Sequence, residues 1–438
     1  MAIIFSKKNA IKLSKHLIIL LLVSITIIVV ITNINKIPNS NSIEPQEIPI
    51  NKLLYNNLST LDKTKQFDRD VEYFMRYWGI KGGSFALMYK DSLIYAKGYG
   101  YANIKDSIEC DVNHIFRVAS VSKLITATSV MKLYEQGKLS LDSQVFGEKG
   151  ILNDSIFLNL KNKNLEKINV EHLLRHTAGF SSPIGDPAFN PAGVARVLDK
   201  ELPLTVDDMV IYASRNRLRT IPGGSYNYSN LGYIVLSKII EKVSGLNYET
   251  YVKDSILAPI GCYDMYLGRN YSKNRAVNEV AYYEVKEAEP VAAYDGSGKL
   301  TMKSNGGNDV TLLSGAGGWI ASPVELLKFV STINNCSVKE DILKPETIRL
   351  MTQYSKKNKP IGWASITSNG EWHRSGSMAG TSALIKRQND GYTWVFISNS
   401  SSWNGPYLSR YMSSRITRAF NRVKEWPKRD MFEIERFN

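Results

Sequence analysis

Residues 116–127 read "FRVASVSKLITA" and place a serine and a lysine three positions apart, Ser120 and Lys123. Because residues three apart share one face of a helix, this hydroxyl and this amine can touch. Just after this segment stands a second Ser-x-x-Lys copy, formed by Ser129 and Lys132. So short a motif also occurs by chance, and only its surroundings can show whether either pair is a nucleophile with its base.

Position separates the two copies. Ser120 follows an extended-looking stretch and stands at the start of a predicted helix that stops at Gly137. There the free backbone N–H groups and the positive end of the helix dipole can stabilise an oxyanion. Ser129 lies nine residues further on, on the opposite face, so we expect it to pack or to bond back to the previous turn. The structural alternative for Ser120 is a helix N-cap.

A serine hydroxyl needs a base before it can attack a carbonyl. The chain has 5 histidines and no G-x-S-x-G segment, so an α/β-hydrolase triad has little support. A lysine can serve instead if burial or a neighbouring cation suppresses its charge, and Lys123 is placed for that role.

Two further segments carry groups that fit this chemistry. Tyr228 and Asn230 follow a Gly-rich turn at the start of an amphipathic helix. The phenol can relay a proton, and the amide can hold both substrate and lysine. In "WHRSGSMAGTSAL", residues 372–384, small residues let a substrate lie along a strand edge, and a basic residue attracts a carboxylate. Without catalysis, Asn230 would be a helix cap, Tyr228 a packing aromatic, and residues 372–384 a Gly-rich turn.

Apolar periodicity and turn residues predict strands at both ends of the domain and helices between them. Hairpins are expected within 82–103, turning at Lys90 and Asp91, and within 381–401, turning at 389–391. Helices are expected around 67–78, 120–136, 168–176, 206–214 and 229–244, after Pro323, and around 406–424. This order predicts an α+β fold: an antiparallel sheet flanked by helices, with an inserted helical region.

Together these segments resemble the serine beta-lactamase and penicillin-binding-protein superfamily, in its class C-like branch. The similarity spans roughly residues 65–425. It rests on the order of "FRVASVSKLITATSVMKLYEQGKLSLD", "INVEHLLRHTAGF", "YNYSNLGYIVLSKIIEKVSG", "GAGGWIASPVELLKFV" and "RSGSMAGTSALI". The resemblance implies a beta-lactamase/transpeptidase-like fold and acyl transfer. Ser120 would be the acylated nucleophile, Lys123 its proton partner, Tyr228 a proton-transfer group and Asn230 a member of the second motif.

The third motif departs from the branch, which usually has Lys-Thr-Gly or His-x-Gly. Alignment on the glycine gives Arg374, Ser375 and Gly376, with His373 one position early. Arginine can bind a carboxylate but stays protonated, so it cannot act as a base; alternatively, His373 takes the place. The resemblance puts the oxyanion hole at the backbone N–H groups of Ser120 and Ser377.

No metal or other cofactor is implied. His172 and His176 stand four apart, a spacing that can ligate zinc, but no third ligand or general-base glutamate accompanies them. The cysteines, Cys110, Cys262 and Cys336, form no C-x-x-C pair, and one disulfide is left open. The net charge is +14, with the cations scattered, which disfavours nucleic acid and favours attraction to a membrane or an acidic wall polymer.

The N-terminus has the pattern of an export signal. Four lysines in residues 1–16 precede an apolar run that extends over 17–34, either a signal peptide or a short membrane anchor. No A-x-A-like site follows, so we favour an uncleaved anchor with a cytoplasmic basic tail and an exported domain in the bacterial cell envelope. Residues 35–60 are expected to be a polar linker, 61–425 the hydrolase domain and 426–438 a C-terminal tail.

These observations predict an exported, membrane-anchored serine hydrolase that forms an acyl-enzyme on an amide, a peptide or an ester. The substrate is a small molecule or peptide, and a cell-wall fragment fits. A non-catalytic module that binds peptides or wall fragments is the alternative, supported by the altered third motif.

Overall fold

A computed structural model describes residues 48–336, 338–355 and 359–434. The expected basic tail, the apolar segment 17–34 and the linker up to residue 47 lie outside the described residues, as do the last four residues. Within the described ranges, no helix combines the length and the apolar character needed to cross a bilayer.

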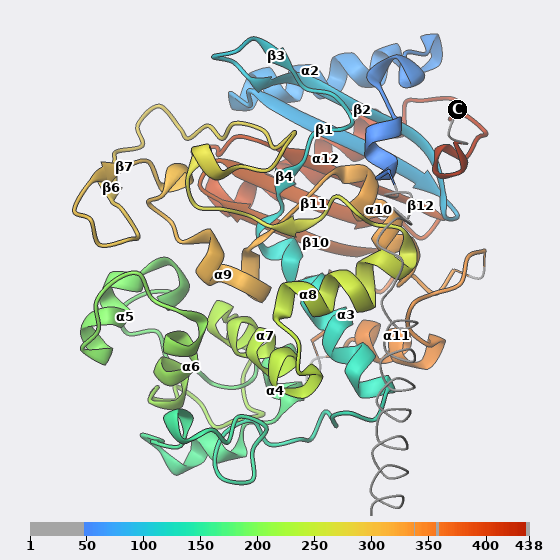
Figure 1. Cartoon of the computed structure of the whole chain (residues 1–438). Coiled ribbons are helices and arrows are strands. Elements are labelled where there is room, and N and C mark those ends of the chain that lie inside the picture. The colour runs from blue at the N-terminus through green and yellow to red at the C-terminus, as the bar shows by residue number, and fades with distance from the viewer. Residues whose placement is uncertain (1–47, 337, 356–358, 435–438) are drawn as a thin grey trace, which may run out of the picture. The chain divides into compact units, whose positions relative to one another are not determined.

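The core element is a seven-stranded antiparallel sheet in the order β3-β2-β1-β12-β11-β10-β9. Its strands are β1 (Gly82–Tyr89), β2 (Ser92–Asn103), β3 (Ile108–Glu109), β9 (Ser365–Ile366), β10 (Trp372–Met378), β11 (Thr381–Arg387) and β12 (Tyr392–Ser398). Because β1 pairs with β12, the two ends of the domain meet in the middle of the sheet (Figure 1). The expected α+β fold and both hairpins are confirmed.

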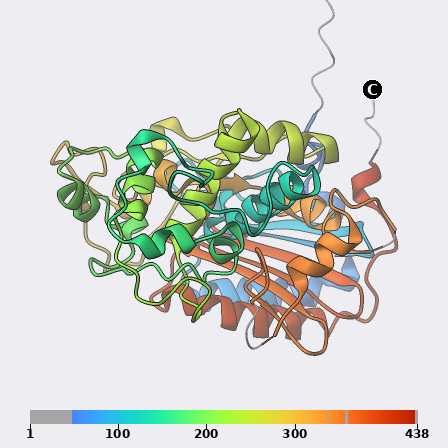
Figure 2. The same ribbon diagram turned by 90° about the horizontal axis from the view of Figure 1, so that it is seen from below.

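Two helices cover one face of this sheet. They are α2 (Lys65–Trp78) and α12 (Leu408–Phe420), which lie side by side along the lower edge of Figure 2. The helical spacing read from the sequence is the buried stripe of α2: Phe67, Val71, Phe74 and Trp78. These side chains join Phe85, Trp394 and Ile416 in one hydrophobic cluster.

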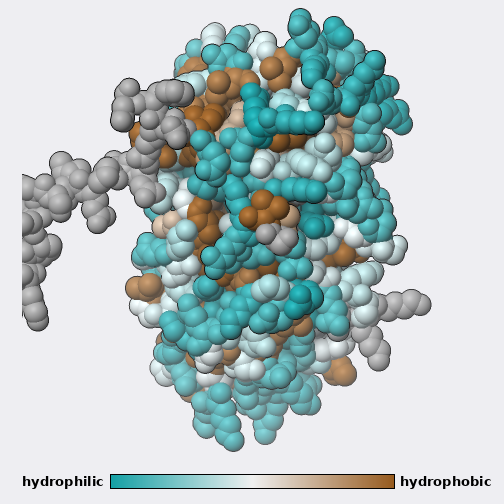
Figure 3. All heavy atoms as spheres, turned by 90° about the vertical axis from the view of Figure 1, so that its right-hand side faces the viewer, coloured by the Kyte–Doolittle hydropathy of each residue, from teal (hydrophilic) through white to brown (hydrophobic). Residues whose placement is uncertain are grey.

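The opposite face carries the inserted helical region, most of which fills the lower half of Figure 1. Its helices are α3 (Ser122–Glu135), α4 (Val170–Leu174), α5 (Pro191–Leu198), α6 (Val206–Ser214), α7 (Asn230–Ser244), α8 (Tyr248–Val252), α9 (Val310–Gly317), α10 (Pro323–Ser331) and α11 (Pro345–Thr352). Helix α10 packs on β1 and β12, and α3 packs on α7 and α9. The face seen in Figure 3 is mainly hydrophilic, with apolar side chains scattered among the polar ones.

A smaller sheet lies between the seven-stranded sheet and the inserted helical region. Strand β8 (Trp319–Ala321) pairs with β4 (Phe116–Arg117) and β5 (Tyr266–Leu267), while β6 (Val291–Ala292) and β7 (Leu300–Thr301) form a separate ladder. The Val118 N–H extends the β4–β8 ladder by donating to the Trp319 carbonyl at 3.0 Å. This ladder fixes the chain just before Ser120.

The folded unit extends beyond the expected limits of 61 and 425. Within residues 48–60, Ile50 and Leu54 are buried, and the Asn51 amide donates to Asp264 Oδ2 at 2.8 Å. Beyond 425, Trp426 and Met431 are buried. The polar composition of both segments masked the few apolar side chains that attach them to the core.

The three cysteines are free thiols. Cys110 and Cys262 are buried, and Cys336 is half-buried. The disulfide that the sequence left open is therefore absent from this structure.

Candidate active site

Ser120 lies in a tight turn immediately before helix α3. The turn is the 3-10 segment η4 (Ala119–Val121), and Ala119 adopts φ 48°, in the left-handed region that non-glycine residues rarely occupy. The helix itself begins at Ser122, whose Oγ accepts the Trp319 N–H at 3.1 Å. Instead of capping the helix, the Ser120 Oγ lies 2.7 Å from the Tyr228 hydroxyl.

Lys123 is fully buried on the next turn of the chain. Its Nζ donates to Asn230 Oδ1 at 2.5 Å and to the Ala316 carbonyl at 2.5 Å, and lies 3.4 Å from the Ser120 Oγ. Burial lowers the pKa of Lys123 to about 8, with the Arg374 guanidinium acting in the same direction and Tyr228 opposing it. The amine therefore loses its proton far more readily than an exposed lysine does.

Tyr228 connects the serine to the two cations. Its ring centre is 4.9 Å from Lys123 Nζ, and its hydroxyl is 3.5 Å from an Nη of Arg374. Desolvation alone would raise the pKa of Tyr228, but Lys123 and Arg374 outweigh it and lower this pKa to about 8. The side chain keeps 42% of its surface exposed, so it also faces the open side of the site.

The histidines of the zinc hypothesis have other contacts. The buried His176 ring lies 4.6 Å from the Tyr228 ring and 5.1 Å from the Tyr233 ring, centre to centre, and its Nδ1 accepts the Ser229 N–H at 3.2 Å. Burial holds the pKa of His176 well below its usual range, so the ring is neutral. His172 closes a capping box with Asn169 at the start of α4. Within the described ranges, no three His, Cys, Asp or Glu residues are grouped to hold a metal.

Asn230 is the first residue of α7 and does not cap it; Ser229 does, by accepting the Gly232 N–H at 3.1 Å. The oxygen and the nitrogen of the Asn230 side-chain amide each form a hydrogen bond. Its Oδ1 accepts from Lys123, and its Nδ2 donates to Asp186 Oδ2 at 2.5 Å. Asp186 stands in an irregular loop and therefore carries no motif signal in the sequence.

Strand β10 brings the third motif against the nucleophile. The Arg374 Nε donates to the Ser120 carbonyl at 2.7 Å. A Cβ on Gly376 would lie 2.2 Å from the Val118 carbonyl and 2.9 Å from the Ser120 nitrogen, so only glycine permits this approach. His373 points to the other face of the strand, since neighbours alternate. Of the two candidates, Arg374 is the residue whose side chain contacts the Ser120 turn.

The backbone edge beside Ser120 is suited to an oxyanion hole. The His373 carbonyl accepts the Ala364 N–H at 3.0 Å, so the backbone polar groups of His373 face β9. Alternate residues share an edge, and therefore Ser375 and Ser377 direct their N–H groups the same way. In the described ranges β9 pairs only with Trp372 and His373, which leaves the edge beside Ser377 free of a neighbouring strand.

Comparison with known proteins identifies the family of this chain. A sequence profile of the Beta-lactamase family matches residues 67–417. Protein flp of Staphylococcus aureus strain N315 is 25% identical over 234 residues, covering 53% of this chain and 44% of the relative, so the chain spans less than half of that protein. The putative penicillin-binding protein PbpX of Bacillus subtilis strain 168 is 24% identical over 340 residues, covering 76% of this chain and 74% of the relative.

Solved structures share the fold at low identity. The D-amino acid amidase of Ochrobactrum anthropi SV3, complexed with L-phenylalanine amide, has a TM-score of 0.64 at 19% identity and covers 83% of this chain and 100% of its own. EstCE1, a hydrolase with promiscuous acyltransferase activity, has a TM-score of 0.63 at 21% identity. The match covers 81% of this chain and 98% of EstCE1. Because the family match runs from Phe67 to Thr417, over most of its length, the chain belongs to the beta-lactamase family.

Proposed function

We propose that this protein is a serine hydrolase that forms an acyl-enzyme at Ser120 on an amide, a peptide or an ester. One observation carries the proposal. The Ser120 Oγ lies 2.7 Å from the hydroxyl of a tyrosine whose pKa is lowered, and a buried lysine stands one turn away. This is the arrangement that an activated nucleophile requires: a hydroxyl, a base within hydrogen-bond reach, and further groups that orient the base.

In this mechanism Tyr228 and Lys123 together accept the Ser120 hydroxyl proton as Oγ attacks the substrate carbonyl carbon. The backbone N–H groups of Ser120 and Ser377 stabilise the oxyanion. Collapse of the tetrahedral intermediate breaks the C–N or C–O bond, and Tyr228 returns the proton to the leaving group. Water then adds to the acyl-enzyme with the same pair as base, which releases the acid and restores Ser120.

Arg374 bears on the class of substrate. Its side chain is only 2% exposed, and its Nε is used by the Ser120 carbonyl. Little of the guanidinium can reach a substrate carboxylate, whereas its charge acts directly on Tyr228 and Lys123. We therefore favour amides and esters that need no free carboxylate next to the scissile bond, including uncharged esters of a wall polymer.

Export and membrane anchoring form a second part of the proposal. They rest on the sequence alone: lysines in residues 1–16, an apolar run over 17–34 and no small-residue cleavage site after it. The test is to fractionate producing cells and treat intact spheroplasts with protease. Recovery in the membrane fraction with digestion of the domain supports an exported, anchored chain. Release into the medium or protection from protease contradicts it.

Hydrolysis is tested by covalent labelling followed by a substrate panel. A fluorophosphonate probe should label the wild type and the Ser129→Ala variant, and Ser120→Ala should abolish the label. Matched p-nitrophenyl esters with and without a carboxylate, nitrocefin and D-Ala-D-Ala peptides then define the substrate class. Absence of labelling by any serine-directed probe would instead identify a binding module for peptides or wall fragments.

A further inference from the structure

A groove lies between α2 and α12. Both helices cover the sheet face opposite the inserted helical region (Figure 2). The volume of the groove is about 370 Å³, and Phe74, Trp78 and Ala419, all mostly buried, form its floor. No part of the proposed mechanism uses it. We call it the α2–α12 groove.

Each wall of the groove is a stripe along one helix. On α12 the spacing of i, i+4 and i+7 puts one set of side chains on a single face, and α2 presents a similar set. The lining residues of the walls are Asp70, Tyr73 and Tyr77 on α2, Tyr411, Arg415 and Arg418 on α12, and Arg422 in the turn after α12. Arg422 pairs with Asp70 at 2.9 Å, and the Tyr411 ring lies 5.0 Å from that of Trp78. These two contacts give the groove a charged end and an aromatic end.

The aromatic end consists of rings that remain open to solvent. Trp403 is 74% exposed and Tyr77 is 69% exposed, although the Trp403 ring lies 5.4 Å from that of Trp78. Exposed aromatic rings beside a hollow provide flat surfaces on which the faces of another ring can stack. A single exposed ring needs no explanation, but a group of them around one hollow does.

The charged end is strongly cationic. Residues 406–424 contain four arginines and a lysine but no aspartate or glutamate. Arg422 is neutralised by Asp70, whereas no described ion pair involves Arg415 or Arg418. A second hollow, of about 530 Å³, adjoins Arg418 and Arg422 and is lined by Lys386, hydroxyl side chains and Asn421. The positive surface therefore continues beyond one groove, which suits an anionic chain more than a single small ion.

We propose that the α2–α12 groove binds an acidic glycan strand. Sugar rings would stack on Tyr77 and Trp403, and the anionic groups would pair with Arg415 and Arg418. The net charge of +14 attracts such a polymer from a distance. A strand can enter a hollow whose floor is Trp78 and Phe74, while a flat bilayer surface meets only the outer edges of the two helices.

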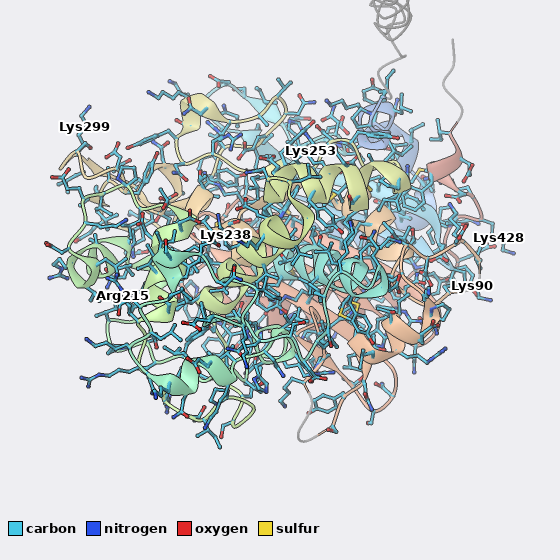
Figure 4. The ribbon with its side chains drawn as sticks, turned by 60° about the horizontal axis from the view of Figure 1, so that its bottom comes forward. Lys90, Arg215, Lys238, Lys253, Lys299 and Lys428 are labelled. Carbon is cyan, nitrogen blue, oxygen red and sulfur yellow. The ribbon has the colours of Figure 1, made fainter. Side chains whose placement is uncertain are left out.

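The test is a binding assay on the full-length chain with polygalacturonate as the probe. Affinity electrophoresis should show retardation by polygalacturonate but not by dextran, weakened by added salt. Arg415→Gln with Arg418→Gln, and separately Trp403→Ala, should each weaken binding about tenfold or more. The matched control is Arg196→Gln with Lys299→Gln, which changes the net charge equally. Both positions are exposed, and Lys299 projects from the far end of the molecule in Figure 4.

Several outcomes would overturn the proposal. Equal losses in the control pair would mean that only net charge matters. Binding of poly-L-glutamate as tight as that of polygalacturonate would indicate an acidic peptide, and binding to phosphatidylglycerol vesicles without polysaccharide binding would indicate a membrane surface. Thermal unfolding at the wild-type temperature would show that each variant is folded. The assay needs no turnover, so its result is independent of the hydrolase proposal.

Discussion

The two Ser-x-x-Lys copies follow one another along the same stretch of chain and have different environments. The Ser120 Oγ bonds to Tyr228, and Lys123 is enclosed by Asn230 and the Ala316 carbonyl. The Ser129 Oγ donates back to the Ile125 carbonyl at 2.9 Å, in the core. Lys132 extends from the helix to the Ile342 carbonyl at 2.8 Å. The motif supplies only a hydroxyl and an amine; segments from elsewhere in the chain turn one copy into a reactive site.

The largest effect is expected from removing the nucleophile. Ser120→Ala should lower kcat/KM by about 10⁴-fold or more, because it removes the hydroxyl that bonds to Tyr228 and attacks the substrate. The same change at Ser129 should leave kcat/KM within about twofold and cost about 1 kcal/mol of unfolding free energy, the contribution of one buried hydrogen bond. Steady-state kinetics measure kcat/KM, and urea unfolding measures the unfolding free energy. A comparable loss of activity in both variants would contradict the separation of the copies.

A similar contrast is expected for the lysines. Lys123→Met should lower kcat/KM by about 10²–10⁴-fold, the usual contribution of a positioned base, because methionine fills the space without accepting a proton. Lys132→Met removes a half-buried amine on the same helix but touches none of the site residues. Its kcat/KM should match the wild type. Pre-steady-state acylation rates would locate the Lys123 effect in the first chemical step, and an effect confined to deacylation would contradict its role in activating Ser120.

Much of the fold could be predicted because the signals are local. Turn residues mark both hairpins, apolar spacing marks α2, and a proline marks the start of α10. The segments that carry the second and third motifs could be located as well, from their order along the chain, although the sequence left Arg374 and His373 as alternatives in the third. Ser120, Lys123, Tyr228 and Arg374 all meet around one site.

The rest had no readable signal for physical reasons. The Ala316 carbonyl holds Lys123, yet every residue type has a carbonyl, so the sequence does not distinguish it. Asp186 acts through Asn230 from an irregular loop. The spacing of His176 from His172 suggests only a metal ligand, whereas its ring packs against Tyr228 from a residue whose backbone is left-handed, at φ 60°. The roles of Ala316, Asp186 and His176 all depend on contacts between segments that are distant in the sequence.

Only the first Ser-x-x-Lys copy has strand β10 packed closely against its serine turn. The variant Gly376→Ala tests the importance of this close approach. The added Cβ would lie 2.2 Å from the Val118 carbonyl, so the strand or the turn must move. We expect a loss of kcat/KM of about 10²-fold, the cost of a misplacement near 1 Å. Overpacking should also lower the unfolding free energy by about 1–3 kcal/mol. Ser375→Ala, on the other face of the same strand, is the control; equal effects in both variants would show that the strand tolerates no change.

The smallest effect concerns Arg374 and is a shift in pH dependence. Arg374 lowers the pKa values of both Lys123 and Tyr228, and the basic forms of these groups are needed to accept the Ser120 proton. The kcat/KM of the wild type should therefore rise as pH increases through about 8. Without the guanidinium both pKa values rise, so Arg374→Gln should move this rise about one pH unit higher.

Arg374→Lys is the matched control, because it keeps the positive charge while losing the planar group that bonds the Ser120 carbonyl. If Arg374 acts through its charge, the lysine variant keeps the wild-type pH profile even where its maximal rate falls. The glutamine variant should recover most of its rate above pH ~9, where its amine and phenol have lost their protons. A shift of equal size in both variants would instead assign the effect to the geometry of the turn that carries Ser120. Lys132 bonds to the Ile342 carbonyl, away from Ser120 and Tyr228, and the Lys132→Met profile should therefore superimpose on that of the wild type.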